Sequence, residues 1–160
     1  MTPSEAIQGV VNACQPLPTI TTGGQPTPEH LAALHEAGVG IVLDLRDPRE
    51  VRPFNEPAAV QSLGMEYINV PVTPITMNDE TLDRVLGVLR SAGDKPVFLH
   101  CGSANRVGGA LIPYLMLDYG LEEEDAVQQA MRIGLRAPDV MEWGLGYARS
   151  HRPKAGSEAP

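Results

Sequence analysis

Aromatic residues, cysteines and basic residues are all scarce in this sequence. Aromatic residues make up 4% of the 160 residues, so a core must be built mainly from aliphatic side chains. Two cysteines far apart in the chain fit a reducing compartment, the cytoplasm, better than a disulfide framework. There is no apolar run as long as a bilayer span, and the N-terminus lacks the basic start and apolar core of a secretory signal. A net charge of −8 argues against nucleic-acid or acidic-membrane partners.

The composition that remains is typical of one globular domain. Hydrophobic residues account for 42% and charged residues for 20% of the chain. We expect a single domain over residues 1–151, followed by a disordered polar tail over 152–160. Strand-like and helix-like patterns alternate along the chain, and this predicts an α/β fold with a central, mostly parallel sheet flanked by helices.

Local patterns predict where these elements lie. Residues 1–26 look loop-like, with one short strand near 17–21. The remaining predicted strands are 40–45, 65–70 and the apolar run that starts at 97. Predicted helices start at Pro28 and stop at Gly38, span 56–63, 78–91 and 121–134, and begin near Asn105 and near Asp139.

The most informative segment is 97–109, an apolar run that ends in Cys101 and continues into a loop of small residues. A cysteine at the end of a strand, just before a helix, can be held as a thiolate by loop N–H groups and the positive end of that helix. Small residues at Gly102, Ser103 and Ala104 let the backbone approach a ligand. Arg106 supplies a planar fork for two oxygens of an oxyanion. The segment therefore predicts a nucleophile and an anion clamp.

A purely structural interpretation of the same residues is open: Cys101 as a buried thiol at a strand end, and Arg106 as a solvated helix residue. His100 precedes the cysteine, but neighbouring side chains in a strand point to opposite faces. We therefore expect His100 to face the interior and to hold the loop backbone by hydrogen bonds. The other cysteine, Cys14, is distant, and no paired metal-ligand spacing occurs. The sequence predicts neither a metal nor a cofactor.

The segment 100–106 resembles the phosphate-binding loop of the cysteine-dependent protein tyrosine and dual-specificity phosphatases. The similarity is to a bacterial branch related to the phosphatase-like domain of beta-lactamase-hydrolase-like proteins. It extends over about residues 20–120, through 24–27, 38–46, Glu56 and 64–72. This resemblance implies the dual-specificity-phosphatase fold and a phosphocysteine intermediate on Cys101. It also implies phosphate binding by Gly102, Ser103, Ala104, Asn105 and Arg106, with a phosphorylated protein or small molecule as substrate and phosphate or sulfate as a ligand of the loop.

Three departures from that pattern keep other functions open. Only four residues separate Cys101 from Arg106, where most of these phosphatases have five; single-domain rhodaneses also use the shorter loop. Ala104 stands where the branch has glycine, and a positive φ there would strain the backbone. Val107 replaces the Ser or Thr that steadies the departing thiolate. The alternatives are a rhodanese-like sulfurtransferase with a Cys101 persulfide, or a catalytically weak anion-binding protein.

Other polar residues near the predicted site have two interpretations each. Asp79 is the only aspartate that could act as a general acid after the strand 65–70, but Thr76 and Asp79 also have the spacing of a helix capping box. Asp44 and Arg46 end a predicted strand at the edge where α/β proteins place their sites. They could reach the anion or form salt bridges with their neighbours.

Overall fold

The computed structural model describes residues 1–153 and places five strands in one sheet. The strand order is β1-β2-β5-β3-β4. β2 (Ile20–Gly23), β5 (Val97–His100), β3 (Ile41–Asp44) and β4 (Glu66–Asn69) pair in parallel, and β1 (Cys14–Leu17) runs antiparallel to β2. The mostly parallel sheet expected from the alternating pattern is confirmed.

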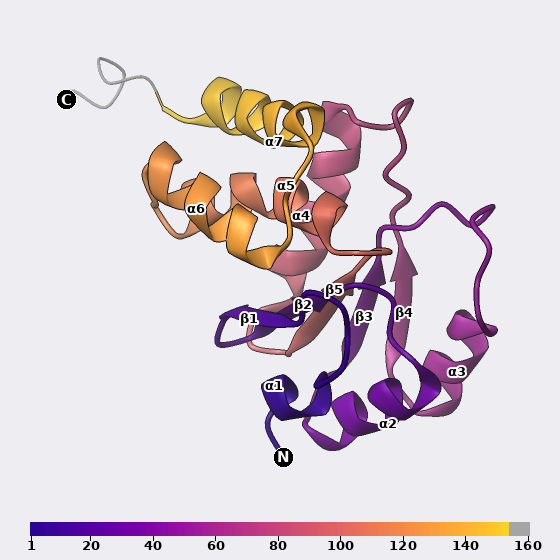
Figure 1. Ribbon diagram of the computed structural model, residues 1–160. Helices are drawn as coiled ribbons and strands as arrows, with labels where there is room; N and C mark the ends of the chain where they lie inside the picture. Colours follow the sequence, from indigo (N-terminus) through magenta and orange to yellow (C-terminus); the bar gives the residue numbers. More distant parts are fainter. Residues whose placement is uncertain (154–160) are drawn as a thin grey trace.

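Helices cover both faces of this sheet (Figure 1). On one face lie α1 (Pro3–Ala6), α2 (Pro28–Glu36) and α3 (Glu56–Ser62). On the other lie α4 (Asp79–Ala92), α5 (Asn105–Pro113) with its π-helical extension η1 (Tyr114–Asp118), α6 (Glu123–Ile133) and α7 (Pro138–His151). Of these helices, α5 is the innermost, because α4, α6 and α7 all pack against it.

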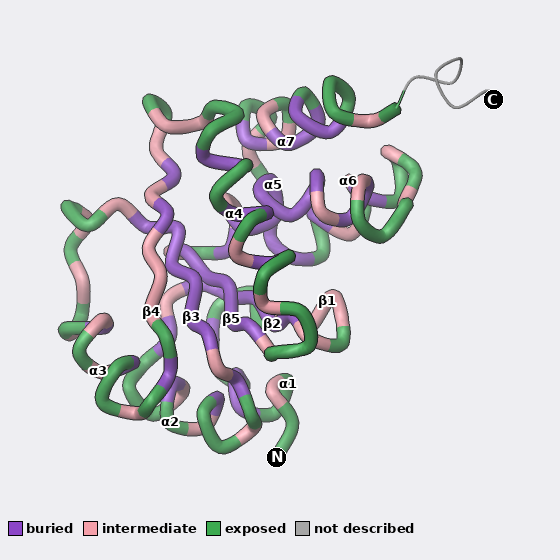
Figure 2. The backbone as a smooth tube through the Cα atoms, turned by 180° about the vertical axis from the view of Figure 1, so that it is seen from behind, coloured by how far each residue is buried: buried purple, intermediate pink, exposed green. Residues whose placement is uncertain are grey.

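The strands divide the interior into two cores because successive side chains point to opposite faces. In β5, Val97 and Leu99 join the core under α4–α7, whereas Phe98 joins the core under α1–α3. β3 and β5 are buried along their whole length, as Figure 2 shows. By the same alternation Cys101 belongs to the α4–α7 side, and His100 faces the side of α1–α3. The predicted divergence of these two side chains is confirmed.

Two local predictions are wrong. The N-terminal segment is not a loop with one strand near 17–21, because it forms α1 and the β1–β2 hairpin, whose turn lies at 18–19, and β2 then pairs with β5. The expected capping box of Thr76 and Asp79 is also absent. Asn78 is the N-cap of α4, its side chain accepting from the N–H of Thr81, and the Thr76 hydroxyl donates to the carbonyl of Pro71. Asn78, two residues nearer the helix than Thr76, takes the cap because its side-chain carbonyl oxygen reaches an orphan N–H of the first turn.

The described part of the chain ends just after α7, at residue 153. Arg152 still belongs to the folded part, since its N–H bonds to Ala148 and its guanidinium donates to the carbonyl of Leu121 at 2.9 Å. The rest of the predicted disordered tail, residues 154–160, lies outside the described residues. Among residues 1–153, no helix has both the length and the apolar character needed to cross a bilayer.

Candidate active site

The loop between β5 and α5 surrounds the sulfur of Cys101. The Cys101 side chain is buried, with 1% of the residue exposed, and the backbone N–H of Ala104 donates to its Sγ at 3.1 Å. α5 begins at Asn105, and its N-cap, Ala104, makes no side-chain capping bond. The positive end of a nine-residue helix and its uncapped N–H groups thus lie beside the sulfur, an arrangement that favours a negative charge there.

The N-terminal segment fixes the orientation of the loop peptides. The N–H of Gln25 donates to the carbonyl of Gly102 at 3.1 Å, and the side-chain amide of Asn12 donates to the carbonyl of Ser103 at 2.8 Å. Because C=O and N–H point in opposite directions across a planar trans peptide, these bonds turn the next two N–H groups, of Ser103 and Ala104, to the other side. The Ala104 N–H is the one that meets the sulfur.

Two close approaches constrain the loop sterically. Gly24 lies so near that a Cβ there would be 2.4 Å from the carbonyl oxygen of Gly102, so only glycine fits. Ala104 has φ +72°, in the left-handed region that costs an L-residue about 1 kcal/mol or more. The strain expected for a non-glycine residue at this position is therefore present. Gly134 packs directly against Ala104 from the α6–α7 connection, where a Cβ on Gly134 would lie 2.8 Å from the Cβ of Ala104.

Arg106 lies at the start of α5 with its terminal nitrogens on Glu50. Nη1 donates to Glu50 Oε2 at 2.7 Å, Nη2 donates to Oε1 at 3.2 Å, and Nη1 also reaches the carbonyl of Val72 at 3.4 Å. Hydrogen bonding from Arg106 lowers the pKa of Glu50 from 4.5 to about 2, although partial burial opposes the charge. Pairing through one edge of the guanidinium leaves Nε–H and the second Nη2 hydrogen for an oxyanion.

The pKa of Arg106 is itself raised. Partial burial opposes its charge, but Glu50 and the nearby Cys101 sulfur outweigh that effect. The guanidinium therefore stays charged next to the thiol, and the loop can hold an anion between them. The two residues that the sequence singles out as nucleophile and clamp are brought together.

His100 is held by a buried carboxylate that sequence reasoning missed. The ring is fully buried; its Nδ1 lies 3.2 Å from the carbonyl oxygen of Cys101, and its Nε2 lies 2.5 Å from Oε2 of Glu56. The predicted hydrogen bond of His100 to loop backbone is confirmed. Glu56 could not be assigned as its partner, because a glutamate in the first turn of a helix is most simply explained by the helix dipole.

Asp44 and Arg46 form salt bridges, the second of their two predicted roles. Asp44 is fully buried and accepts from Arg52 Nη1 at 2.5 Å and from the Tyr67 hydroxyl at 2.6 Å. Burial and the hydrogen bond to Asp44 raise the pKa of Tyr67 well above its usual range. Arg46 donates through Nε to Glu50 at 3.1 Å.

Asp44, Glu56 and His100 form a compact cluster whose ligand-type atoms lie within 4.8 Å of one another. No local sequence pattern points to this cluster, because the three residues are far apart in the chain. Arg52 already supplies a cation there, 2.5 Å from Asp44 and 4.0 Å from Glu56. We therefore interpret the cluster as an ionic network of protein side chains.

Asn105 and Asp79 are the first residues of two helices, α5 and α4. The Asn105 side chain accepts from the N–H of Arg136 at 2.7 Å and of Ala137 at 3.1 Å, so it fastens the α6–α7 connection to the loop. Asp79 is the exposed first residue of α4, in the first turn where an acid favours the helix dipole. Its carboxylate also influences Tyr147 of α7 electrostatically, which indicates that it lies on the side of α4 near that helix.

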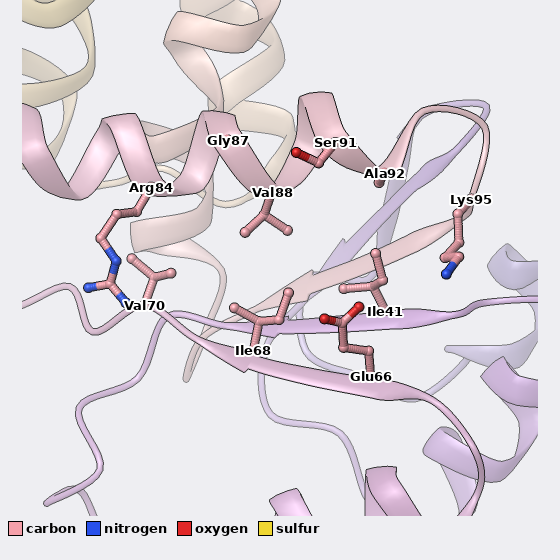
Figure 3. Close-up of a pocket in the computed structure, with 10 residues that line it drawn as sticks. All are labelled: Ile41, Glu66, Ile68, Val70, Arg84, Gly87, Val88, Ser91, Ala92 and Lys95. Atoms are coloured by element: carbon pink, nitrogen blue, oxygen red, sulfur yellow. The ribbon is translucent and has the colours of Figure 1, made fainter.

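A separate groove of about 500 Å³ lies between α4 and the edge strand β4 (Figure 3). Its floor includes Ile68 and Val70, with Arg84 toward one end and Lys95 toward the other. None of its lining residues belongs to the loop 101–106. The groove contains no cysteine and is distinct from the candidate active site.

Comparison with known proteins identifies the family and the fold. Residues 12–133 match the family model described as "DSP-PTPase phosphatase fused to NAD+ Kinase". No curated protein matches the chain. A candidate phosphatase (DUF442) from Shewanella putrefaciens CN-32 superposes with a TM-score of 0.76 at 21% identity, over 92% of this chain and 97% of that one.

Two further solved structures have the same fold and were determined with ligands. TpbA from P. aeruginosa in complex with pTyr gives a TM-score of 0.68 at 20% identity, covering 93% of this chain and 86% of its own. The core catalytic domain of the PP-IP phosphatase SIW14 from S. cerevisiae, in complex with citrate, gives 0.74 at 16% identity, covering 88% and 87%. At these identities the likeness establishes the fold, which is the dual-specificity-phosphatase fold that the sequence predicts.

Proposed function

The chain belongs to the family of DSP-PTPase phosphatases fused to NAD+ kinase and is a cysteine-dependent phosphatase; we propose that Cys101 is its nucleophile and Arg106 its phosphate clamp. One observation carries this assignment: the Cys101 sulfur accepts an N–H bond from Ala104 at the uncapped N-terminus of α5. Arg106 stands beside it with one edge of its guanidinium unpaired by Glu50. The same region offers a nucleophile, backbone N–H groups that can bind an anion, and a fixed cation.

The proposed reaction has two displacements at phosphorus. The thiolate of Cys101 attacks a phosphomonoester, the bond from phosphorus to the ester oxygen breaks, and that oxygen leaves with the bonding electrons as a phenolate or alkoxide, which takes its proton from water. Water then attacks the phosphocysteine, the S–P bond breaks, and inorganic phosphate leaves with the thiolate restored. The N–H of Ser103 and the guanidinium of Arg106 stabilise the charge on the equatorial oxygens in both steps, and the N–H of Ala104 stabilises the sulfur as it attacks and leaves.

The leaving group sets the expected substrate range. The candidate acid Asp79 is the first residue of α4. The carboxylate that contacts Arg106, Glu50, has a pKa of about 2 and stays ionised. Without a protonated acid in place, phenolic esters should react faster than alkyl esters, since phenolates leave without help. We therefore propose an aryl phosphate, of a protein or a small molecule, as the preferred substrate class; pTyr bound to TpbA is chemically of this kind.

The proposal extends to partners and compartment. Inorganic phosphate or sulfate should bind in the loop as a product-like ligand. The net charge of −8 disfavours nucleic acid and acidic membranes as partners. Because the reaction needs a reduced thiol, we propose that the protein works in a reducing compartment, the cytoplasm.

The test measures hydrolysis of an aryl phosphate, and sulfur transfer from thiosulfate to cyanide, with the same preparations. Cys101→Ser should abolish hydrolysis, and Arg106→Ala should lower kcat/KM on the order of 10²-fold or more. Cys14→Ser is the matched control, because it removes the other thiol, on β1, and should leave the rate unchanged. Activity with thiosulfate alone would instead identify a sulfurtransferase. Phosphate binding without turnover of either substrate would identify an anion-binding protein.

A further inference from the structure

Glu56 is a buried carboxylate that the phosphatase reaction above does not use. It is the first residue of α3 and has no exposed surface. Oε2 meets Nε2 of His100 at 2.5 Å, and Oε1 accepts from the side-chain amide of Gln25 at 2.7 Å. A buried charge is costly unless it is paired and hydrogen-bonded, and both oxygens of this one are committed to neighbours of the catalytic loop.

The geometry around His100 fixes where the protons are. Nδ1 faces the carbonyl oxygen of Cys101, which can only accept, so Nδ1 carries a hydrogen. Nε2 faces a carboxylate oxygen of Glu56, and a short contact there requires a proton between the two atoms. That shared proton makes them an imidazolium–carboxylate pair when it lies on the ring and a neutral pair when it lies on the carboxyl, and the neighbouring groups decide between the two. Burial opposes protonation of the ring, but the hydrogen bond and charge of Glu56, helped by Asp44, raise the pKa of His100.

The other charged groups around the ring preserve this state. From β3, Asp44 Oδ1 lies 3.8 Å from Nε2, and from the segment before α3, Arg52 pairs with Asp44 and lies 4.0 Å from Glu56. The uncharged Tyr67 hydroxyl of β4 donates to Asp44, and the Phe98 ring of β5 stacks on His100 at 5.4 Å. Asp44 therefore favours the proton on the ring, and Arg52 favours an ionised Glu56, so these charges stabilise the imidazolium–carboxylate pair.

Through Gln25, Glu56 also reaches the Arg106 half of the site. The backbone N–H of Gln25 donates to the carbonyl of Gly102, and its side-chain oxygen accepts from Arg46. Arg46 in turn donates to Glu50, the carboxylate that holds Arg106. The two hydrogen bonds of one buried carboxylate thus lead to the Cys101 carbonyl on one side and to the Arg106 guanidinium on the other.

We propose that Glu56 is a positioning residue of this phosphatase: it holds His100 as an imidazolium against the Cys101 carbonyl and holds Gln25 against the loop. This inference rests on the proposed roles of Cys101 and Arg106. A positive charge directly behind the loop stabilises the thiolate without touching the substrate. Glu56 acts only through its neighbours.

The experiment compares Glu56→Gln, Glu56→Asp and the exposed control Glu66→Gln, all in a Cys14→Ser background so that only Cys101 reacts. The rate of alkylation by iodoacetamide is measured against pH, which needs no turnover. We expect Glu56→Gln to move the midpoint of alkylation upward by about one pH unit. At pH values below the midpoint, this corresponds to a roughly tenfold smaller fraction of thiolate. Glu56→Asp keeps a carboxylate, so its midpoint should lie closer to that of the wild type. Glu66→Gln should leave the midpoint unchanged.

The outcomes separate this inference from the proposed function. An unchanged midpoint in Glu56→Gln, with loss of stability only, would make Glu56 structural and overturn the inference while leaving the function intact. A wild-type midpoint equal to that of Cys14, measured in Cys101→Ser, would overturn the proposed nucleophile itself. If Glu56→Gln does not fold, the ¹⁵N shifts of His100 in the wild type decide: both ring nitrogens protonated near pH 7.5 support the pair, and a singly protonated ring refutes it.

Discussion

Replacing Glu50 by glutamine should remove a defined part of the acid sensitivity of the fold. The folded-state pKa of Glu50 is about 2, compared with 4.5 in the unfolded chain, chiefly because Arg106 donates to it. At about 1.36 kcal/mol per unit, this shift corresponds to an upper limit of about 3.4 kcal/mol at neutral pH. Since 32% of the Glu50 side chain and 23% of that of Arg106 are exposed, screening by solvent reduces the expected contribution to about 1–2 kcal/mol.

The sign of the pH dependence follows from the lowered pKa. A carboxyl whose folded pKa is depressed contributes fully above its unfolded pKa of 4.5, and the contribution is lost as the pH falls toward 2. Roughly half should disappear between pH 5 and pH 3. Urea unfolding followed by the fluorescence of Trp143, the only tryptophan, measures the free energy of unfolding at each pH.

The informative quantity is the difference between wild type and Glu50→Gln, because all other carboxyls titrate alike in both. We expect the wild type to be more stable at pH 7 and the gap to shrink below pH 5. Glu66→Gln, which changes an exposed glutamate on β4, should track the wild type throughout. A gap that is constant from pH 7 to pH 3 would refute the proposed charge pairing of Glu50 with Arg106.

Three further changes test the loop and the leaving-group step. Gly24→Ala should destabilise the fold by about 1–3 kcal/mol and lower kcat, because the new Cβ meets the Gly102 carbonyl; thermal unfolding and the aryl phosphate assay check both, and wild-type values would contradict the close approach. Ala104→Val should destabilise by about 2 kcal/mol, since a β-branched residue would have to adopt φ +72° against Gly134; a stability equal to wild type would show that the loop relaxes. Asp79→Asn should change kcat/KM for an aryl phosphate by less than about twofold, whereas a hundredfold loss would identify Asp79 as a general acid.

Much of the fold was predictable because its determinants are local. Strands β3, β4 and β5 and helices α2 to α4 follow from apolar periodicity and caps such as Thr27, and all lie within a few residues of their predicted bounds. The β1–β2 hairpin was missed, although one strand was expected near 17–21, because β1 contains a proline and β2 ends in a glycine, two residues that disfavour strands. β2 is a strand because the parallel partner β5 lies alongside it, and that contact spans more than 70 residues.

The candidate site was predictable only along its contiguous segment. Cys101, Arg106 and the small residues between them stand together in the sequence, so their chemistry could be inferred from spacing. The residues that fix them in place are spread over the chain: Asn12 and Gln25 hold the loop carbonyls, and Glu50 holds Arg106. No local pattern distinguishes such residues from solvated surface polar groups.

Glu56 shows most clearly why burial cannot be inferred from sequence at such positions. Asn55-Glu56-Pro57 has the N-cap, acid and proline of an ordinary exposed helix start, and α3 does begin there. Yet the α2–α3 side of the sheet brings that helix start onto His100, where Asp44 already contributes one negative charge. A second ionised acid is stabilised in this place by Arg52 and by a protonated His100. The requirement for a charged His100 therefore arises from the fold as a whole, and it can be seen only when the four side chains are placed together.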